Sequence, residues 1–497
     1  MFNKNTVIAP ASKTIKISFN DFDKNPEPSK NAHLKESDTP KVSYNFSVVN
    51  GMLEDGYGFR DLMLPYREND RTEHKIDTRG YDILSVWDFR WFDYQTRNND
   101  TFIFFMDSSF NPHYFYEYSY QGILFSTDMV FTSMPTIFEY RVEDYNMLIC
   151  SSPTDDLNLY AGGSRLFTYS DAPKMLSCCV HENSFYAIST DDSSKLIYTD
   201  SLNAFDWAGS NFQEYLFTGG EGGRLRKLFS FNDYVYLFRD TGIVKIYPFS
   251  NDNPLSITHI YYSSSFIFPE TIQRCGEYII FITREGLHLF DGNSVEKVNL
   301  EIFDLVDTSL YETFCSASQR GKYYLACKIN FNDGQTVGCE ASSLGYKNNA
   351  ILIYDVESGS IEIMRGVDVS DFAPIESNIV SKLVCTFNND NIKHLGELTL
   401  DGEVFGELLP KKWTSVETNF GYAENMKVIK SFSLFAKKDC QVEIKSDVET
   451  KVINIKGKDN FQKIKTLVKG KYFEISFIST EKGQKISSPE FEVEVLL

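Results

Sequence analysis

Two stretches of this sequence are near copies of each other, and their repetition constrains the fold more than any other feature. The first, YVYLFRDTGIVKIYPF, covers residues 234–249, and the second, YIIFITREGLHLF, covers residues 278–290. In each, an aromatic residue opens an apolar run, a short polar segment follows, and a second apolar run comes after a glycine. This pattern predicts two antiparallel strands joined by a tight turn, with Gly242 in the φ > 0 position that a short hairpin needs. Gly286 occupies the matching place in the second copy.

The same unit recurs along the chain at near-constant spacing. Aromatic-led apolar runs begin at Phe102, Tyr145, Phe185, Tyr234, Tyr278 and Tyr323, and a weaker run begins at Lys382. The steps between them are 43, 40, 49, 44, 45 and 59 residues, and the longest step contains a polar insertion at residues 330–349. Units of about 40–50 residues with three or four short strands are typical of β-propeller blades. We therefore expect an all-β fold, a β-propeller of about seven blades.

The alternative folds are one large β-sandwich or several small β-domains. Alternating strands alone fit all of these, whereas the near-constant spacing favours the propeller, because one blade has two apolar faces that only neighbouring blades can cover. The blade type stays open, since neither a Trp-Asp signature nor a kelch-type glycine doublet recurs with each unit. Residues 301–314, EIFDLVDTSLYETF, are the best helical candidate and are expected to lie between blades.

Four parts follow from this interpretation. Residues 1–40 are polar and contain proline, which predicts an extended N-terminal arm. Residues 41–82 carry a strong hairpin signal at Asn50-Gly51. Residues 83–424 contain the repeats and are predicted to form the propeller body. Residues 425–497 alternate apolar and polar side chains between turns, as a small C-terminal β-sandwich does.

Charge is unevenly divided between these parts. The net charge is −20, but residues 425–497 contain 14 Lys against 10 Asp and Glu, so residues 1–424 carry −24. An acidic body argues against a protein that holds nucleic acid by neutralising phosphates. The first 25 residues lack the apolar core of a signal peptide, and no run of 18 apolar residues occurs. The nine cysteines show no metal-binding spacing, so the sequence predicts a soluble protein with buried thiols, made in a reducing cytoplasm.

Motifs for catalysis, cofactors or metals are weak or missing. No GxSxG or HExxH motif occurs, and His288 lies in an apolar strand pattern that favours a structural role. GGEGGR at residues 219–224 lacks the Lys-Ser/Thr pair of a phosphate loop and is interpreted as a link between blades. DFDKN at residues 21–25 resembles the start of a calcium loop but lacks Gly at the sixth position and Glu at the twelfth. We therefore predict no catalytic, cofactor-binding or metal-binding residues and no enzyme activity.

The order of the parts resembles that of the tail hub, nozzle and packaged-DNA-stabilisation proteins of tailed bacteriophages. The resemblance is carried by NFSVVNGMLEDGYGF at residues 45–59, by the repeated hairpins, and by residues 411–439, which join the body to the C-terminal part. It implies a homo-oligomeric ring, commonly of six copies, in the virion tail beneath the portal and adaptor and near other tail proteins such as fibres. Such a protein would be assembled in the host cytoplasm, without stable membrane insertion. DNA would pass through it without tight binding, which an acidic wall favours.

Two other functions remain open. A carbohydrate-binding or glycan-cleaving receptor-binding propeller would use the many aromatic residues and carboxylates, although the sialidase repeat Ser-x-Asp-x-Gly-x-x-Trp is missing. A cytoplasmic interaction scaffold would use the flat face of the propeller. A glycan array with a hydrolysis screen tests the first function, and retention of a host partner from lysate tests the second.

Overall fold

The structure, a computed structural model, is almost entirely β-strand. It describes residues 12–19, 22–28, 39–65, 73–76, 78, 80–116, 125–142, 144–162, 165–199, 204–207, 212–218, 222–247, 255–343, 345–376, 381–389 and 392–497. The helices in these ranges are short 3₁₀ turns. None of the described helices is long and apolar enough to cross a membrane.

The two repeated hairpins are the central strands of neighbouring sheets. β21 (Tyr234–Arg239) pairs with β22 (Gly242–Tyr247), and β25 (Tyr278–Thr283) pairs with β26 (Gly286–Phe290), both antiparallel across two-residue turns. Gly286 has φ +119°, as a turn glycine can. The prediction of a positive φ for Gly242 is wrong. Gly242 is already a paired strand residue, and a Cβ added there would lie 3.0 Å from the Tyr261 carbonyl oxygen, so close backbone approach favours glycine.

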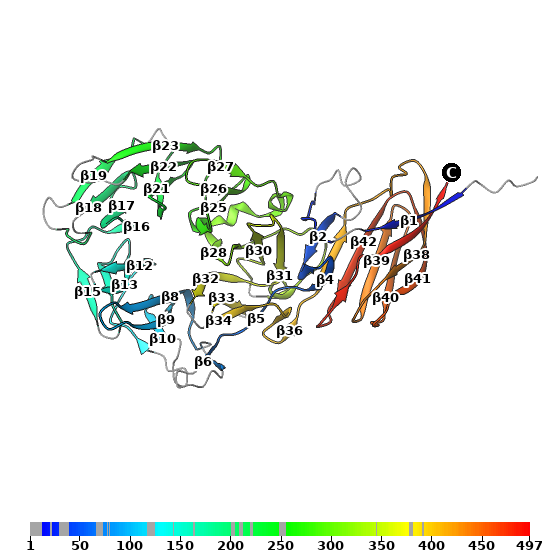
Figure 1. Cartoon of the computed structure of the whole chain (residues 1–497), viewed down its shortest axis with the longest axis horizontal. Coiled ribbons are helices and arrows are strands. Elements are labelled where there is room, and N and C mark those ends of the chain that lie inside the picture. The colour runs from blue at the N-terminus through cyan, green and yellow to red at the C-terminus, as the bar shows by residue number, and fades with distance from the viewer. Residues whose placement is uncertain are drawn as a thin grey trace, which may run out of the picture.

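Successive sheets built on such hairpins are arranged around a ring, the architecture of a β-propeller (Figure 1). We name each sheet by its first strand. Eight strands form one sheet that we describe as two halves joined by the pairing of Tyr145 with Asp93. The first half, called the β8 sheet, contains β8 (Ile83–Asp93), β9 (Asn98–Asp107), β10 (Pro112–Tyr116) and β11 (Phe125–Ser126). The second half, called the β12 sheet, contains β12 (Thr136–Val142), β13 (Tyr145–Ser151), β14 (Leu157–Tyr160) and β15 (Leu166–Tyr169). The β16 sheet contains β16 (Met175–His181), β17 (Ser184–Ser189), β18 (Lys195–Thr199) and β19 (Phe212–Leu216).

The ring continues with three further four-stranded sheets. The β20 sheet contains β20 (Leu225–Phe231), β21, β22 and β23 (Ser256–Tyr262), and the β24 sheet contains β24 (Gln273–Cys275), β25, β26 and β27 (Val295–Lys297). The β28 sheet contains β28 (Cys315–Gln319), β29 (Lys322–Cys327), β30 (Ala350–Asp355) and β31 (Ile361–Arg365). Every predicted anchor residue, from Phe102 to Tyr323, lies in the second strand of its sheet. The all-β class and the propeller architecture are therefore confirmed.

The β32 sheet is completed by a strand from near the start of the chain. It contains β32 (Val369–Glu376), β33 (Ser381–Asn389), β34 (Ile392–Thr399), β5 (Gly58–Asp61), β35 (Glu403–Val404) and β36 (Glu407–Leu408). β5 pairs antiparallel with β34, and β32 packs against β28 on one side and β8 on the other. Residues 58–61, which the sequence-based division assigned to a separate hairpin region, are thus part of the propeller.

Apolar side chains fill the space between adjacent sheets. Tyr186 and Leu196 of the β16 sheet pack against Leu228 and Val244 of the β20 sheet, and similar clusters lie at the other boundaries. The Tyr236 hydroxyl donates to the Gly292 carbonyl oxygen at 3.0 Å across one such boundary. Each sheet therefore buries both faces against its neighbours, which explains why the unit repeats.

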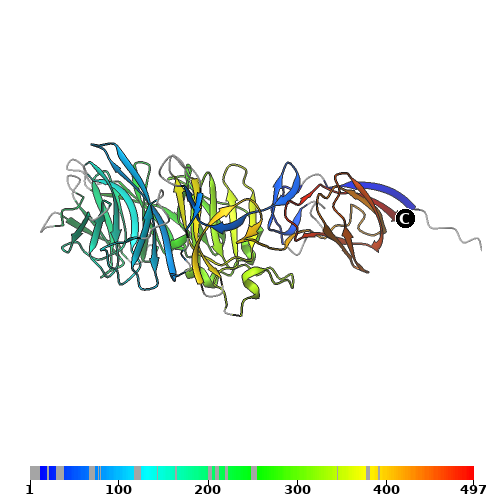
Figure 2. The ribbon, with the colours of Figure 1, turned by 90° about the horizontal axis from the view of Figure 1, so that it is seen from below.

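The C-terminal unit lies beside the ring, so that the molecule is elongated (Figure 2). Two sheets enclose one apolar core that includes Trp413 and Phe432. The first sheet contains β1 (Ser12–Ser18), β44 (Glu490–Leu496), β38 (Met426–Leu434) and β41 (Gln462–Gly470). The second contains β2 (Pro40–Tyr44), β37 (Lys411–Ser415), β42 (Phe473–Ser479), β39 (Cys440–Ser446) and β40 (Thr450–Ile455).

The described N-terminal residues, predicted to form an extended arm, pack on this unit. β1 pairs antiparallel with β44 along its whole length. Phe19 and Phe22 are buried, with ring centroids 5.9 Å and 4.9 Å from that of Trp413. The reason is that Ile15 and Ile17 alternate with polar residues, so one face of the segment can cover the core. Residues 1–11 and 29–38 of the predicted arm lie outside the described residues.

Two local predictions have clear outcomes. The hairpin at Asn50-Gly51 is present, with φ of +51° and +73° at the turn between β3 (Phe46–Val49) and β4 (Met52–Asp55). β4 also pairs with β43 (Lys485–Ile486), so this hairpin belongs with the C-terminal unit. The helical candidate at residues 301–314 forms two 3₁₀ turns, η4 (Glu301–Leu305) and η5 (Thr308–Thr313).

Candidate functional site

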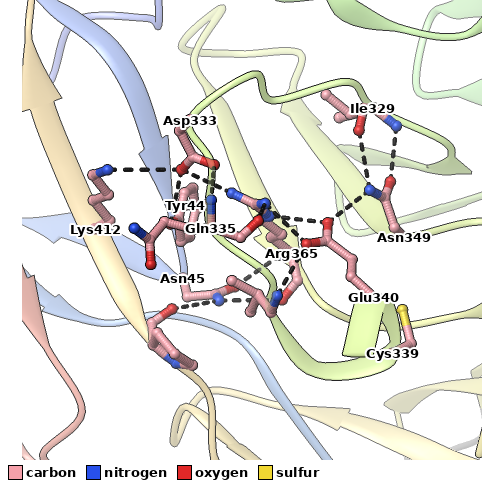
Figure 3. Close-up of polar contacts among 12 residues, drawn as sticks. Tyr44, Asn45, Ile329, Asp333, Gln335, Cys339, Glu340, Asn349, Arg365 and Lys412 are labelled. Carbon is pink, nitrogen blue, oxygen red and sulfur yellow. Dashed lines mark hydrogen bonds and ion pairs between the residues drawn. The ribbon is translucent and has the colours of Figure 1, made fainter. Parts of the chain in front are cut away.

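The junction between the propeller and the C-terminal unit is organised around Arg365, at the end of β31 (Figure 3). This side chain is 3% exposed. Its guanidinium donates to both carboxylate oxygens of Glu340, at 3.0 and 2.9 Å, and to Asp333 at 3.0 Å. It also lies over the Phe331 ring, 4.1 Å from the centroid, and the Tyr44 ring, 4.8 Å away. Two partly buried carboxylates thus compensate one buried cation in a fixed geometry.

The predicted insertion, residues 330–349, supplies most of these partners. Asp333 and Glu340 both come from it, and Glu340 also accepts a hydrogen bond from Asn349 at 2.7 Å. Burial opposes ionisation of Asp333, but the positive charge of Arg365 and the hydrogen bonds it accepts keep its pKa below the usual value. Lys412 of β37, 3.7 Å away, adds a second cation from the C-terminal unit. The insertion therefore connects the two units.

Asn45, between β2 and β3, joins the two units through main-chain groups. Its side chain accepts from the Arg365 amide at 2.8 Å and donates to the Arg365 carbonyl at 3.1 Å and the Pro410 carbonyl at 2.8 Å. Its own amide donates to the Ile363 carbonyl at 2.8 Å. Asn45 has φ +60°, a conformation that asparagine tolerates better than most residues. Three hydrogen bonds of the buried side chain and one of the main-chain amide set the orientation of the β2–β3 segment on β31.

A second buried ion pair strengthens the C-terminal side of the junction. Lys411, whose side chain is 1% exposed, pairs with Asp55 at 2.8 Å and donates to the Glu481 carbonyl at 2.6 Å. Asp55 also accepts from the Gly483 amide at 2.6 Å. These contacts join segments more than 350 residues apart in the chain.

A pocket of about 330 Å³ lies beside the junction. Its lining includes Cys339, Tyr346, Asp368, Asn388 and Phe405. Burial raises the pKa of the Cys339 thiol far above its usual value, so this sulfur is a poor nucleophile. Asp368 accepts from the Asn348 amide at 2.9 Å and from the Asn388 side chain at 3.1 Å. The Asp368 carboxylate thus has amide donors, whereas the buried Asn388 Oδ1 has no hydrogen-bond partner among the described residues.

The centre of the ring holds a second cavity, of about 510 Å³, with mixed charge. It is lined by Asp88 and Arg90 of β8, Arg274 of β24, and Glu376 of β32, together with Arg320. Burial, followed by the nearby charge of Glu139, raises the pKa of Asp88 to about 7, against the opposing effect of Arg90. A carboxyl group that titrates near neutrality has the property that a general acid needs.

Asp88 was not singled out from the sequence. Its only signal is a lone aspartate inside the apolar run VWDFRWF at residues 86–92. Asp371, on β32, is similar: burial raises its pKa to about 6, although it accepts hydrogen bonds from the Ser85 hydroxyl and the Val86 amide. The raised pKa values of Asp88 and Asp371 depend on closure of the ring, because closure brings β8 and β32 together.

The structure also places the residues considered from sequence. His288 is buried, is within hydrogen-bonding distance of the Gly286 carbonyl at 3.1 Å, and stacks on Phe281 at 5.1 Å between centroids. Gly222 and Gly223 lie between β19 and β20, as a link between sheets would; residues 219–221 lie outside the described residues. Asp21 also lies outside them, and Asn25 binds the β31 backbone through Ile361.

The nine cysteines are all free thiols in the structure. Eight are buried and Cys339 is partly buried, which agrees with the predicted buried thiols. Among the residues that the structure describes, no group of three or more His, Cys, Asp or Glu side chains could hold a metal ion.

Comparison with known proteins gives weak structural similarities, with TM-scores below 0.5 for the three structures named here. No family model and no curated protein matches the chain. The extracellular domain of the hybrid two-component system BT4673 from B. thetaiotaomicron has 10% identity and a TM-score of 0.43, covering 90% of this chain and 63% of that one. BBS1N in complex with ARL6DN has 8% identity and a TM-score of 0.42, covering 69% and 98%. The Pan2 WD40 domain of Neurospora crassa has 9% identity and a TM-score of 0.36, covering 64% and 90%.

Proposed function

We propose that this protein is a structural component of a bacteriophage tail, a hub or nozzle part that acts without catalysis. Six copies would form a ring around the channel through which DNA leaves the virion, in contact with portal, adaptor and fibre proteins. The protein would assemble in the host cytoplasm before joining the virion. The observation that carries the proposal is the junction, where the buried Asn45 binds the Arg365 backbone and Lys412 pairs with Asp333, which fixes a propeller to a second β-unit.

The physical argument is mechanical. Buried ion pairs are costly to form, and their best-attested benefit is a defined geometry. A part that bears load between neighbours needs such a geometry, whereas a flexible tether would suffice for a simple binding domain. The acidic body, −24 over residues 1–424, further supports a conduit that repels phosphate rather than gripping it.

The proposal includes the number of blades and the architecture of the C-terminal unit. We propose that the β8, β12, β16, β20, β24, β28 and β32 sheets are seven blades of one closed propeller, sealed by β5. The contact of β32 with β8 supports closure, and pairing of β5 with β34 would prevent the last sheet from detaching. We propose that the C-terminal unit is a β-sandwich, because its two sheets share one core.

Electron microscopy and mass photometry of the full-length purified protein test this function. The expected result is a ring with six-fold symmetry and a central opening, and no retention of double-stranded DNA at about 150 mM salt. A protein that stays monomeric at 50 μM and does not associate with tail proteins would contradict the proposal.

A second candidate function is glycan cleavage within the ring, and Asp88 is the observation that favours it. The pKa of about 7 suits a general acid, and a 510 Å³ cavity adjoins it. A hydrolysis screen with the wild type and Asp88→Asn would detect it. Activity lost in the variant supports cleavage, and no activity in either protein dismisses it.

A further inference from the structure

The cavity at the centre of the ring, of about 510 Å³, is bordered by strands that are neighbours around the ring. Its lining residues lie on or next to the first strands of four sheets, β8, β24, β28 and β32. β24 contacts β28, β28 contacts β32, and β32 contacts β8. Figure 1 shows β28 and β32 on the inner side of the ring. The charged side chains of this cavity therefore belong to one continuous stretch of the inner wall.

Three arginines line this cavity, Arg90, Arg274 and Arg320, and all three have exposed side chains. Arg274 lies one residue before the end of β24, and Arg320 lies one residue after the end of β28. These two arginines therefore approach the cavity from the same end of adjacent sheets. A guanidinium group carries only N–H donors, and its planar shape matches that of a carboxylate. The cavity thus offers many donors to a planar anion.

Arg274 and Arg320 use few of these donors within the protein. Arg274 donates to the Gly276 carbonyl oxygen at 3.4 Å, and Arg320 donates to the Ser381 hydroxyl at 3.0 Å. Neither arginine has a carboxylate within 4.0 Å among the residues that the structure describes. Most of their donors are therefore available to a ligand, with which a charged hydrogen bond is strong.

Arg90 is also weakly engaged. It donates to the Glu376 carbonyl oxygen at 3.4 Å, and the Glu139 carboxylate lies 3.8 Å from its Nε. Arg226, which lines another cavity of the ring, differs because it donates to the Asp240 carboxylate at 2.5 Å. Close pairing is thus possible for an arginine of the inner wall, and the arginines of the central cavity lack it.

Three carboxylates, Asp88, Glu277 and Glu376, line the same cavity. Within the described part of the chain, none of them forms an ion pair with a cation within 4.0 Å. An ionised carboxylate accepts hydrogen bonds and donates none. A ligand of this cavity must therefore present acceptors to the arginines and donors to the carboxylates. A simple anion meets only the first requirement, and the carboxylates repel it.

The other lining residues favour a ligand that is polar throughout. Ser318 and Gln319 add hydrogen-bonding groups, and Pro374 is the one apolar side chain among the described lining residues. The volume of about 510 Å³ lies within the range of small-molecule sites. A sugar that carries a carboxylate meets these requirements, because its carboxylate accepts from guanidinium groups and its hydroxyls donate to carboxylates.

We propose that the central cavity of the propeller binds a sugar that carries a carboxylate. Arg274 and Arg320 would hold the carboxylate of the sugar, and Asp88 and Glu376 would accept from its hydroxyls. The inference goes beyond the proposed mechanical role and does not depend on it. It also concerns binding rather than cleavage, so a monosaccharide without a glycosidic bond is a sufficient probe.

Ligand-observed NMR titration of the full-length protein with glucuronate, glucose and acetate tests the ligand class. Glucuronate should bind with a dissociation constant of about 1 mM or below, since several charge-assisted hydrogen bonds hold it. Glucose lacks the carboxylate and acetate lacks the hydroxyls, so each should bind at least about 10-fold more weakly. The inference is overturned when glucuronate binds no tighter than glucose or acetate, or shows no binding up to about 20 mM.

Variants of the two arginines test the location of the site. Arg274→Gln and Arg320→Gln keep a polar side chain but remove the charge, and each should weaken glucuronate binding at least about 10-fold. Their melting temperatures should stay close to that of the wild type, because both side chains are exposed. Glucuronate binding that persists unchanged in both variants overturns the proposed site.

The matched control is Arg284→Gln, which should bind glucuronate like the wild type. Arg284 is exposed in the turn between β25 and β26, at the opposite end of the sheet that carries Arg274. Mass photometry of the same samples separates this inference from the proposed function. A wild type that forms rings without binding glucuronate overturns this inference alone, and one that binds glucuronate but stays monomeric overturns the proposed function alone.

Discussion

Replacing Arg365 by methionine should destabilise the junction strongly. Methionine keeps much of the length and apolar contact of the side chain between the Tyr44 and Phe331 rings. It removes the charge and all four hydrogen bonds that the guanidinium donates, including that to the Gln335 carbonyl at 2.8 Å. The change therefore isolates the electrostatic contribution.

The loss of stability in Arg365→Met depends on the hydrogen-bond donors that Asp333 and Glu340 keep. Removing one partner of a buried ion pair costs about 3–5 kcal/mol, because the other charge stays buried. Asp333 keeps the Tyr44 hydroxyl at 3.2 Å, and Glu340 keeps the Asn349 amide group at 2.7 Å. These remaining donors place the loss of Arg365 at the lower end, about 3 kcal/mol in the free energy of unfolding, or roughly 100-fold in the equilibrium constant.

Urea unfolding followed by tryptophan fluorescence measures the global effect, and hydrogen exchange of residues 330–349 measures the local one. The matched control is Lys456→Met, since Lys456 pairs with Asp439 at 2.5 Å but is 82% exposed, so its loss should leave the free energy of unfolding close to that of the wild type. Adding Glu340→Gln to Arg365→Met should recover part of the loss. An Arg365→Met protein within about 1 kcal/mol of the wild type, with unchanged exchange in the insertion, would refute the reasoning.

Three further variants have defined outcomes. Asp88→Asn should raise the melting temperature more at pH 8 than at pH 5. The reason is that a carboxyl with a folded pKa of about 7 binds a proton that the unfolded chain releases. The stability of the wild type therefore falls as the pH rises through that value. Phe22→Ala should cost the C-terminal unit about 3–5 kcal/mol, seen as faster amide exchange there. Gly338→Ala should lower the melting temperature, since its Cβ would lie 2.1 Å from the Gly366 carbonyl oxygen; Gly334→Ala, also at positive φ but in open space, is the control.

Local periodicity explains how much of the propeller could be predicted. An aromatic residue at or near the start of an apolar run marks the second strand of each sheet, because that strand is covered on both faces and its side chains must be apolar throughout. Tyr234 and Tyr278 show this most clearly, and even the weak run at Lys382 falls within β33. The spacing of the apolar runs predicts the sheets because the strands of each sheet are neighbours in sequence and pair mainly with one another.

The contacts between residues far apart in the sequence could not be predicted from local periodicity. β5 pairs with β34 across more than 330 residues, and Asn45 recognises Arg365 across 320. No local sequence pattern predicts such partners, because many different sequences are compatible with strand pairing and with a single buried asparagine. The insertion at residues 330–349 shows the same limit: its polar composition marked an insertion but no partner, whereas Asp333 and Glu340 face a buried guanidinium.

The pairing of β1 with β44 has a consequence for synthesis on the ribosome. The strand at residues 12–18 has to wait for residues 490–496 before it can pair. At about 5–20 residues per second, that delay is roughly 25–100 s. During this time Phe19 and Phe22 have no core to enter, and the nascent chain presents them to chaperones or to other chains on the same messenger. Translation speed thus sets how long the chain is prone to aggregate.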